Sequence, residues 1–449
     1  MRIRLRPAVL ILLSYITAII LGTILLILPI SSAGGGLSLI DAIFTATSGI
    51  CVTGLTVVPT GTHFTLFGKL VILGLIQLGG LGLMAFSTLM FLSVGLRISS
   101  SHRWVIQEVF THTPTADLYS LIKSIFIFTF SVELIGALIF FVHWHGQFPG
   151  ANGIFYSVFH SISAFCNAGF SLFGDSFVGF RGDPVINLTL GLLIILGGIG
   201  FFVVYEIFQR VRRRGGKIRL SLHSKMVIVT TLFLILFGMA IIYGVEYDNH
   251  LLNFPSYQKV FLSFFQSVTA RTAGFNTVDL NLLHNAVLFL LIILMFVGAS
   301  PGSCGGGVKT ATFAVLISLM WNRLMGRGTV NVFKRTIPQE VVRKVVAIFV
   351  VAVSFITLMT FLLLLTQAEG RIAPQSEGLF LKYLFEVVSA FGTVGLSLGV
   401  TSQLNVVGKI ILITTMYVGR VGLLTVAYGI AREELVGPYQ FAEENVMVG

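Results

Sequence analysis

SGICVTGL at residues 48–55 is the first of four related segments in this chain. The other three are SAFCNAGF (163–170), TARTAGFN (269–276) and SAFGTVGL (389–396). Each sets a glycine among small and polar residues, and each lies between two long apolar stretches. Four copies at intervals of about 105 to 121 residues predict a chain of four structural repeats, in which the copies meet around one axis.

The composition places these repeats in a membrane. Hydrophobic residues make up 55% of the 449 residues and charged residues only 10%. Apolar stretches of about 20 residues are long enough to cross about 30 Å of hydrocarbon as helices. The weak ten-residue alternation of a membrane β-barrel is absent. We therefore predict an all-α polytopic membrane protein.

The net charge of +11 is distributed according to topology. Most of the 29 Lys and Arg residues occupy alternate connections between the apolar stretches, as at 210–225 and 323–344. The positive-inside rule places these connections, and both termini, on the cytoplasmic side of the cytoplasmic (inner) membrane. We expect no nucleic-acid partner. Contact with membrane lipid is expected, and docking of an acidic cytoplasmic partner or of anionic lipid remains open.

Each predicted repeat contains a span, a short helix that enters the membrane halfway, a loop and a second span. The predicted repeats are residues 1–100, 101–215, 216–335 and 336–449. The predicted span pairs are 8–28 and 67–94, 119–143 and 185–209, 224–246 and 285–320, and 341–366 and 406–431. The half-spanning helices are predicted at 40–50, 153–166, 257–270 and 378–391, and these apolar stretches are too short to cross a bilayer. We expect Asp41 to cap the first of them.

A half-spanning helix that enters from outside points its carboxyl end at the middle of the membrane. The partial negative charge of that end favours a cation. A following glycine permits the left-handed backbone that turns carbonyl groups toward the axis, and Thr53, Thr272 and Thr393 offer further oxygens. Four such ends form a cation-binding filter without a carboxylate.

The chain resembles the Trk/Ktr/HKT superfamily of potassium transporters over nearly its whole length, most closely the membrane subunits of bacterial Ktr systems. The segments that carry the likeness are DAIFTATSGICVTGL (41–55), GLIQLGGLGLM (74–84), SVFHSISAFCNAGFSL (157–172), INLTLGLLIILGGIGF (186–201), FFQSVTARTAGFN (264–276), FEVVSAFGTVGLSLG (385–399) and MYVGRVGLLT (416–425).

The resemblance implies potassium uptake through a single-chain pore. It also implies a homodimer regulated by a KtrA-like cytoplasmic ring of nucleotide-binding subunits. K⁺ is then the transported ion, a dependence on Na⁺ is open, and no cofactor is expected in this chain. The predicted filter residues are Val52, Thr53 and Gly54; Asn167, Ala168 and Gly169; Thr272, Ala273 and Gly274; and Thr393, Val394 and Gly395.

The second span of the third repeat contains FVGASPGSCGGGVKTAT (296–312), which cannot form a continuous helix. Proline costs a helix about 3 kcal/mol and each glycine about 1 kcal/mol. We predict an intramembrane gating loop here, the alternative being a simple packing bend; the resemblance supports the gate. The predicted gating residues are Gly302, Ser303, Gly305, Gly306, Gly307, Lys309 and, in the last span, Arg420.

Arg420 and Arg271 are charged residues at predicted membrane depth. A lone arginine there is costly, so Arg420 should face the ion path or a polar partner. We expect it to act as a fixed positive barrier below the filter, with a structural ion pair as the alternative. Arg271, beside the third filter segment, is expected to brace its loop, with Glu386 as the suggested partner.

Two other classes of function were weighed against a pore. An alternating-access cation carrier is the alternative within transport, but such carriers are typically built from inverted repeats with a midplane site. The repeats here have parallel topology. No HExxH motif or convergent Ser/His/Asp set indicates an intramembrane enzyme.

Overall fold

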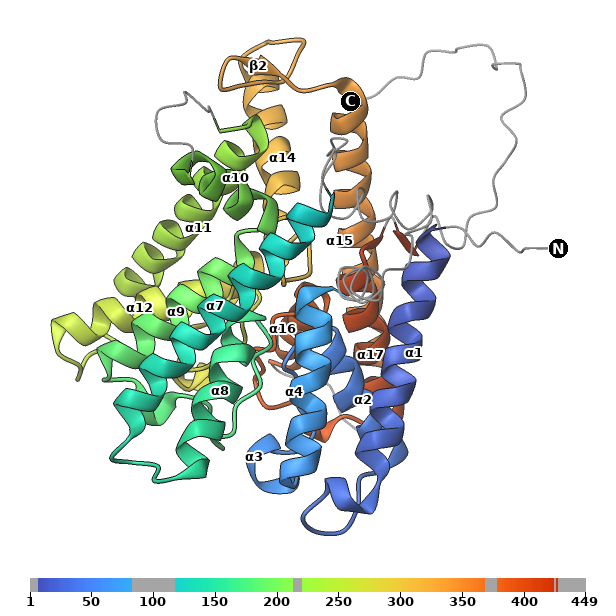
Figure 1. Ribbon diagram of the computed structural model, residues 1–449. Helices are drawn as coiled ribbons and strands as arrows, with labels where there is room; N and C mark the ends of the chain where they lie inside the picture. The colour runs from blue at the N-terminus through green and yellow to red at the C-terminus, as the bar shows by residue number, and fades with distance from the viewer. Residues whose placement is uncertain (1–6, 83–117, 213–219, 368–377, 424, 427–449) are drawn as a thin grey trace.

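The computed structural model describes residues 7–82, 118–212, 220–367, 378–423 and 425–426 (Figure 1). Helices make up most of this part of the chain, which confirms the predicted all-α class. Strands occur in these ranges in a small antiparallel hairpin, β1 (Asn331–Val332) and β2 (Arg335–Thr336). Its two-residue turn is formed by Phe333 and Lys334, both with positive φ.

The helices follow the predicted order of span, half-spanning helix and second span. The first helices of the repeats are α1 (Pro7–Ile27), α7 (Leu118–Trp144), α11 (Leu222–Glu246) and α15 (Gln339–Gln367). The short helices that follow, which we call the pore helices, are α2 (Leu39–Ile50), α8 (Ala151–Phe165), α12 (Ser256–Thr269) and α16 (Leu379–Gly392). The second helices are α4 (Leu66–Leu81), α9 (Pro184–Gly198), α13 (Asn285–Phe296) and α17 (Val406–Val421). The remaining helices are α3 (Thr60–His63), α10 (Phe201–Arg212), α14 (Thr310–Leu324) and the 3₁₀ turns η1 (Pro29–Ser31), η2 (Val178–Phe180), η3 (Leu280–Leu282) and η5 (Thr401–Gln403).

The first helices are long and apolar enough to cross a membrane. They present large apolar side chains outward, among them Leu21, Leu134 and Leu358, each more than half exposed. Such outward surface is unfavourable in water and suited to lipid. The second helices are shorter, at 12 to 16 residues.

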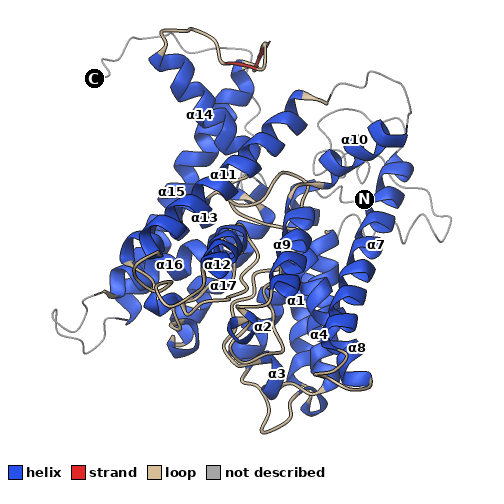
Figure 2. Cartoon of the chain, turned by 90° about the vertical axis from the view of Figure 1, so that its left-hand side faces the viewer, coloured by secondary structure: helices blue, strands red, loops and turns tan. Residues whose placement is uncertain are grey.

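Packing between the repeats closes into a ring. Each pore helix packs against the first helix of its own repeat, α1 on α2, α7 on α8, α11 on α12 and α15 on α16. Each second helix packs against the pore helix of the next repeat, α4 on α8, α9 on α12, α13 on α16, and α17 back on α2. Figures 1 and 2 show α17, from the end of the chain, beside α1 and α2 from its beginning. The described helices therefore surround one axis.

Three of the second helices end at equivalent glycines. The local sequences are LGGLG (78–82), LGGIG (196–200) and VGRVG (418–422), and the last glycine of each has φ between 82° and 96°. A residue with a side chain rarely adopts this conformation. In the third repeat, the long break between α13 and α14 takes the corresponding place.

These breaks correct three predicted spans. The stretch 185–209, predicted as one helix, is α9 and α10 joined at Gly200 with a bend of 95°. The span predicted at 67–94 is helical to Leu81, and the span predicted at 406–431 is helical to Val421. Residues 83–94 and 427–431 lie outside the described part. The broken helix predicted at 285–320 is confirmed.

A second glycine in the same motifs lets the pore helices approach closely. A Cβ atom on Gly79, Gly197 or Gly419 would lie within 3.0 Å of a backbone carbonyl oxygen near the carboxyl end of a pore helix. The three carbonyls belong to Ile50, Phe165 and Phe391. Because each stands two residues before the first predicted filter residue of its repeat, the glycines set the depth of the filter.

The outer end of the ring is closed by an ion pair. Lys409 Nζ at the start of α17 lies 2.6 Å from Asp41 Oδ1 at the start of α2. The cap of α2 is Ser38, whose Oγ accepts from the amide of Asp41 and donates to Asp41 Oδ2. Asp41 was predicted as the cap itself, and it is instead the third residue of the helix that Ser38 caps.

Alanine at Gly79 should destabilise the protein, whereas alanine at Gly74 in the same helix should not. The added methyl group at Gly79 meets the carbonyl of Ile50, and such overpacking costs about 1–3 kcal/mol. Nothing lies within 4 Å of a Cβ at exposed Gly74, where alanine should gain up to about 1 kcal/mol of helix propensity. Thermal unfolding of the detergent-solubilised variants tests this, and equal melting temperatures would contradict the close approach.

Candidate functional site

The predicted filter segments lie directly after the four pore helices, and we call them the filter loops (52–54, 167–169, 272–274 and 393–395). The first residue of every loop is left-handed, with φ of 58° at Val52, 59° at Asn167, 73° at Thr272 and 49° at Thr393. The third residue is left-handed as well, with φ of 87° at Gly54, 68° at Gly169, 78° at Gly274 and 93° at Gly395. In an extended chain successive carbonyls point to opposite sides. Reversing alternate residues brings them to one side, which is the arrangement that a ring of cation ligands needs.

The four loops touch one another in cyclic order. A Cβ atom on the glycine of each loop would lie within 3.0 Å of the carbonyl oxygen of the middle residue of the next loop. The pairs are Gly54 with Ala168, Gly169 with Ala273, Gly274 with Val394, and Gly395 with Thr53. The fourth pair joins the end of the chain to its beginning. Glycine is therefore required at all four positions both by its φ and by the space available.

Hydroxyl groups on the pore helices hold the loops. Ser48 Oγ accepts from the amide of Gly54 and Ser389 Oγ accepts from the amide of Gly395, each at 3.1 Å. Ser163 Oγ donates to the carbonyl of Phe170 at 2.8 Å, and Thr269 Oγ1 donates to that of Phe275 at 2.7 Å. These buried bonds tie each loop to the helix that precedes it.

The alignment of the loops corrects one detail of the sequence interpretation. Thr53 was grouped with Thr272 and Thr393, but the backbone makes Val52 the equivalent of those two threonines. Thr272 Oγ1 hydrogen-bonds to the side-chain amide of Asn167 at 3.1 Å, and Thr393 Oγ1 accepts from the amide of Gly306 at 2.9 Å. The inner mouth of the loops thus carries polar side chains in three repeats and valine in the first.

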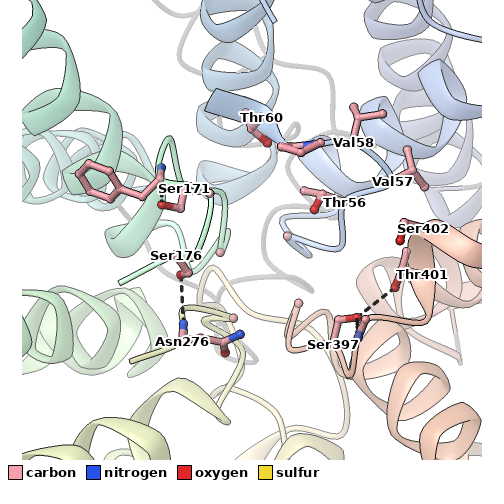
Figure 3. A pocket seen from close by; sticks show the side chains of 18 residues that line it. Thr56, Val57, Val58, Thr60, Ser171, Ser176, Asn276, Ser397, Thr401 and Ser402 are labelled. Carbon is pink, nitrogen blue, oxygen red and sulfur yellow. Dashed lines mark hydrogen bonds between the residues drawn. The ribbon is translucent and has the colours of Figure 1, made fainter. Parts of the chain in front are cut away.

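A cavity of about 340 Å³ opens on the other side of the glycines. The residue two positions after each glycine lines it, namely Thr56, Ser171, Asn276 and Ser397. Figure 3 shows these side chains coming from four separate loops around the opening. We call this cavity the vestibule, and it is lined by a polar side chain from each of the four repeats.

Below the loops lies the break between α13 and α14, which we call the inner loop (297–309). Its ends pair through a parallel bridge between Val297 and Val308. The amide of Ser300 donates to the carbonyl of Gly198 at 3.0 Å, and that of Cys304 donates to the carbonyl of Gly197 at 3.1 Å. The inner loop is therefore bonded to the end of α9.

The inner loop also touches the filter loops from below. Besides the bond from Gly306 to Thr393, a Cβ atom on Gly305 would lie within 3.0 Å of Thr272 Oγ1. Cys304 is fully buried. Gly302, Ser303 and Gly307 belong to the same loop; Gly302 accepts from the amide of Phe201, and Gly307 donates to the carbonyl of Gly419 at 3.3 Å. The predicted gating segment thus lies against two of the four filter loops.

Two basic side chains hold this loop by its carbonyl oxygens. Lys309 Nζ donates to the carbonyl of Gly305 at 2.6 Å. Arg420 Nη1 donates to the carbonyl of Cys304, and its Nη2 donates to the carbonyl of Gly79 in α4. Arg420 occupies the position that Gly80 and Gly198 take in the equivalent motifs of the first two repeats. The guanidinium therefore bridges the inner loop, α17 and α4.

Arg271 and Glu386, two buried charged residues near the filter loops, have different partners from those that the sequence suggested. Arg271 Nη1 donates to the carbonyl of Thr231 at 3.4 Å, whereas Glu386 accepts from Ser397, Leu398 and Thr401. The suggested Arg271–Glu386 pair is therefore wrong. The partners of Glu386 lie beyond its own helix, and no spacing in the sequence indicates them.

Glu133 in α7 has a partner that the sequence did not indicate. Its carboxylate accepts from Gln77 Nε2 in α4 at 3.1 and 3.2 Å, and the residue is 4% exposed. An acid in an apolar span signals a buried partner. Because Gln77 belongs to the preceding repeat, only the ring packing brings the two together.

Residues 4–434 match the model of the TrkH family, which is described as a family of cation transport proteins. This chain belongs to that family. It is 39% identical to "Ktr system potassium uptake protein B" of Bacillus subtilis (strain 168), over 96% of this chain and 94% of the relative. It is 40% identical to the protein of the same name from Vibrio alginolyticus, over 98% and 94%.

The crystal structure of the potassium transporter TrkH from Vibrio parahaemolyticus has the same fold, with a TM-score of 0.74 and 20% identity. The match covers 96% of this chain and 86% of that one. The chain is accordingly a multi-pass membrane transport protein and not an enzyme.

Arg420→Ala should expose Cys304 to thiol reagents. In a Cys51→Ser, Cys166→Ser background, buried Cys304 should react slowly with a small thiol-specific reagent. Losing the guanidinium bond to its carbonyl should speed labelling about tenfold, the scale of one charge-assisted hydrogen bond. Mass spectrometry over time gives the rates. Labelling at the same rate with and without Arg420 would show that the arginine does not hold the loop.

Proposed function

We propose that this chain takes up potassium through the pore at the centre of its ring, and that the filter loops select the ion by their carbonyl oxygens. The closed cycle of contacts among the four glycine loops carries this proposal. The names of the relatives, potassium uptake proteins of Ktr systems, support K⁺ as the ion.

The physical basis of uptake is the replacement of water by fixed oxygens. A K⁺ ion that leaves the polar vestibule loses its hydration shell and gains the carbonyls of Val52 to Gly54 and their equivalents. The carboxyl ends of α2, α8, α12 and α16 face the same region, and their partial negative charge favours the cation. No carboxylate is needed among the twelve filter residues, and none is present there.

We assign gating to the inner loop. It lies against Thr272 and Thr393, so an ion leaving the filter meets buried backbone at Gly305 and Gly306. Glycines give this segment the freedom to change conformation. Arg420 is assigned the role of a fixed positive barrier that also fastens the loop. An ion pair that only stabilises packing does not account for its two carbonyl partners.

An alternating-access cation carrier is the second candidate. Such a carrier is typically built from inverted repeats that rock about a midplane site. Here the repeats have parallel topology and close into one ring, which favours a pore.

We further propose the assembly that the family resemblance implies and the orientation that the charge distribution predicts. As a subunit of a Ktr-type system the chain would form a homodimer and bind a KtrA-like ring of nucleotide-binding subunits. Both termini and the basic connections, including the β1–β2 hairpin, would face the cytoplasm. K⁺ is then the only ion required at the filter, with Na⁺ dependence open to measurement.

Gly54→Ser should weaken discrimination of K⁺ over Na⁺. A side chain at this position meets the carbonyl of Ala168 and requires a φ of 87°, so the first filter loop is strained and pushed away from the second. K⁺ and Na⁺ fluxes into liposomes measure the ratio, which should fall about tenfold if the distortion costs about 1.4 kcal/mol. Gly146→Ser, with nothing within 4 Å, is the matched control. A Gly54→Ser variant with the parent's ratio would argue against a carbonyl filter.

Arg420→Ala and deletion of 302–306 should each raise K⁺ flux. At about 6 Å and an effective dielectric of about 20, the guanidinium and a K⁺ ion repel by about 3 kcal/mol. Because Arg420 bonds to Cys304 within the deleted segment, the combined variant should gain less than the sum of the two effects. A double-mutant cycle on flux, with thermal stability measured in parallel, tests the gate. Loss of stability without any gain in flux would place Arg420 among structural ion pairs.

A further inference from the structure

The outer ends of two filter loops are held by side chains that the filter itself does not use. They stand nine residues before the glycine in their pore helices. The four residues at this position are Thr45, His160, Phe265 and Glu386. His160 and Glu386, both fully buried, reach past the filter to the chain beyond it.

Both carboxylate oxygens of Glu386 accept hydrogen bonds from the residues that directly follow the fourth filter loop. Oε1 accepts from Ser397 Oγ at 2.6 Å and from the amide of Leu398 at 3.1 Å, and Oε2 accepts from Thr401 Oγ1 at 2.8 Å. Three donors on one carboxylate match an ionised group, which can only accept. In the described part of the chain, the ion pairs join His143 to Asp183 and Lys409 to Asp41, so no cation neutralises Glu386 there.

His160 makes the same connection in the second loop. Its Nε2 accepts from the amide of Leu172 at 3.1 Å and lies 3.3 Å from Ser171 Oγ. Nδ1 must then carry the proton, and it donates to the carbonyl of Tyr156 at 2.8 Å. Ser171 and Leu172 stand two and three residues after Gly169, as Ser397 and Leu398 do after Gly395. Glu386 and His160, which we call the two braces, are therefore equivalent by position. Glu386 is the anionic brace and His160 is the neutral one.

The other two loops are held differently. Thr45 Oγ1 donates to the carbonyl of Asp41 in its own helix, and Phe265 has no polar atom. In the third loop, Asn276 is bonded from the second repeat, through Ser176 Oγ and the amide of Phe177. Figure 3 shows the Ser176–Asn276 bond at the rim of the vestibule. The anionic brace thus belongs to the fourth loop alone.

We propose that Glu386 and His160 are positioning residues for ion discrimination. Through Ser397 and Ser171, which line the vestibule, they fix the outer end of the filter. This inference rests on the proposed filter, but it concerns residues outside it. We expect substitution of Glu386 to affect ion discrimination more than substitution of His160, because hydrogen bonds to a charged group are stronger than those between neutral groups.

The test compares Glu386→Gln with Glu246→Gln. Glu246 is an equally buried carboxylate that accepts from the amide of His284 at 2.8 Å and from Asn249 at 3.0 Å. It is the last residue of α11 and does not line the vestibule. Glu386→Gln should lower the K⁺/Na⁺ flux ratio in liposomes about tenfold, the scale of one lost charge-assisted hydrogen bond, while Glu246→Gln keeps the parent's ratio.

His160→Phe keeps the ring that stacks on Phe173 at 4.7 Å but removes the acceptor. It should lower the ratio about threefold, as expected for a bond between neutral groups. Glu386→Asp, which keeps the charge, should restore part of the ratio lost in Glu386→Gln. If Glu386→Gln does not fold, Ser397→Ala and Thr401→Val remove the donors instead and should lower the ratio in the same direction.

The outcomes separate this inference from the proposed function. If Gly54→Ser lowers the ratio while folded Glu386→Gln and His160→Phe keep it, the filter stands and the braces are only structural. If Glu246→Gln lowers the ratio as much as Glu386→Gln, the effect is a general one of buried carboxylates and the inference fails. A parent protein that does not discriminate between the ions would overturn the proposed function itself.

Discussion

The structure depends on the close approach of glycine backbones to carbonyl oxygens. It occurs twice in each of three repeats. Gly79, Gly197 and Gly419 let the second helices approach the ends of the pore helices, and Gly54, Gly169 and Gly395 let each filter loop touch the next. A side chain at any of these positions would separate backbones that must meet. The helices set the direction of the loops, but the absence of a Cβ allows four loops to form one ring.

The ring has fourfold symmetry in its backbone and departs from it in its charges. The filter loops repeat the same left-handed positions, whereas Arg420, Lys309, Glu386 and Arg271 each occur in a single repeat. Below the filter, Arg420 and Lys309 bond to the inner loop. Above it, Glu386 holds one loop by a carboxylate. The backbone ring repeats four times, whereas the single charges make its two sides different.

Much of the fold was predictable because its signals are local. The pore helices begin and end within a few residues of their predicted positions, since short apolar stretches followed by glycine leave few alternatives. The break at 297–309 was predictable for the same reason, from proline and clustered glycines. The bend at Gly200 was missed because LGGIG (196–200) lies within a continuous apolar stretch, and hydropathy alone does not reveal a left-handed residue. The repeat boundaries at 100, 215 and 335 remain predictions.

Side-chain partners were less predictable. Glu386 was assigned to Arg271 because both are charged and near the filter loops, yet three hydroxyl and amide donors that follow its own filter loop satisfy it. Thr53 was matched to Thr272 by residue type, whereas the φ angles match Val52 to it. Pairs such as Gln77 with Glu133 join different repeats. These contacts depend on how the helices pack in the ring, and the pattern of one sequence does not indicate which helices are in contact.

That one chain supplies all four walls has a consequence for how the pore can vary. In a ring made of four identical subunits, one substitution is present four times around the axis. In this chain one substitution changes one repeat, and the other three repeats keep their sequence. Val52, Asn167, Thr272 and Thr393 already place three different residue types at the four equivalent positions of one ring. The four repeats of this chain can therefore diverge one at a time, and selection acts on each change separately.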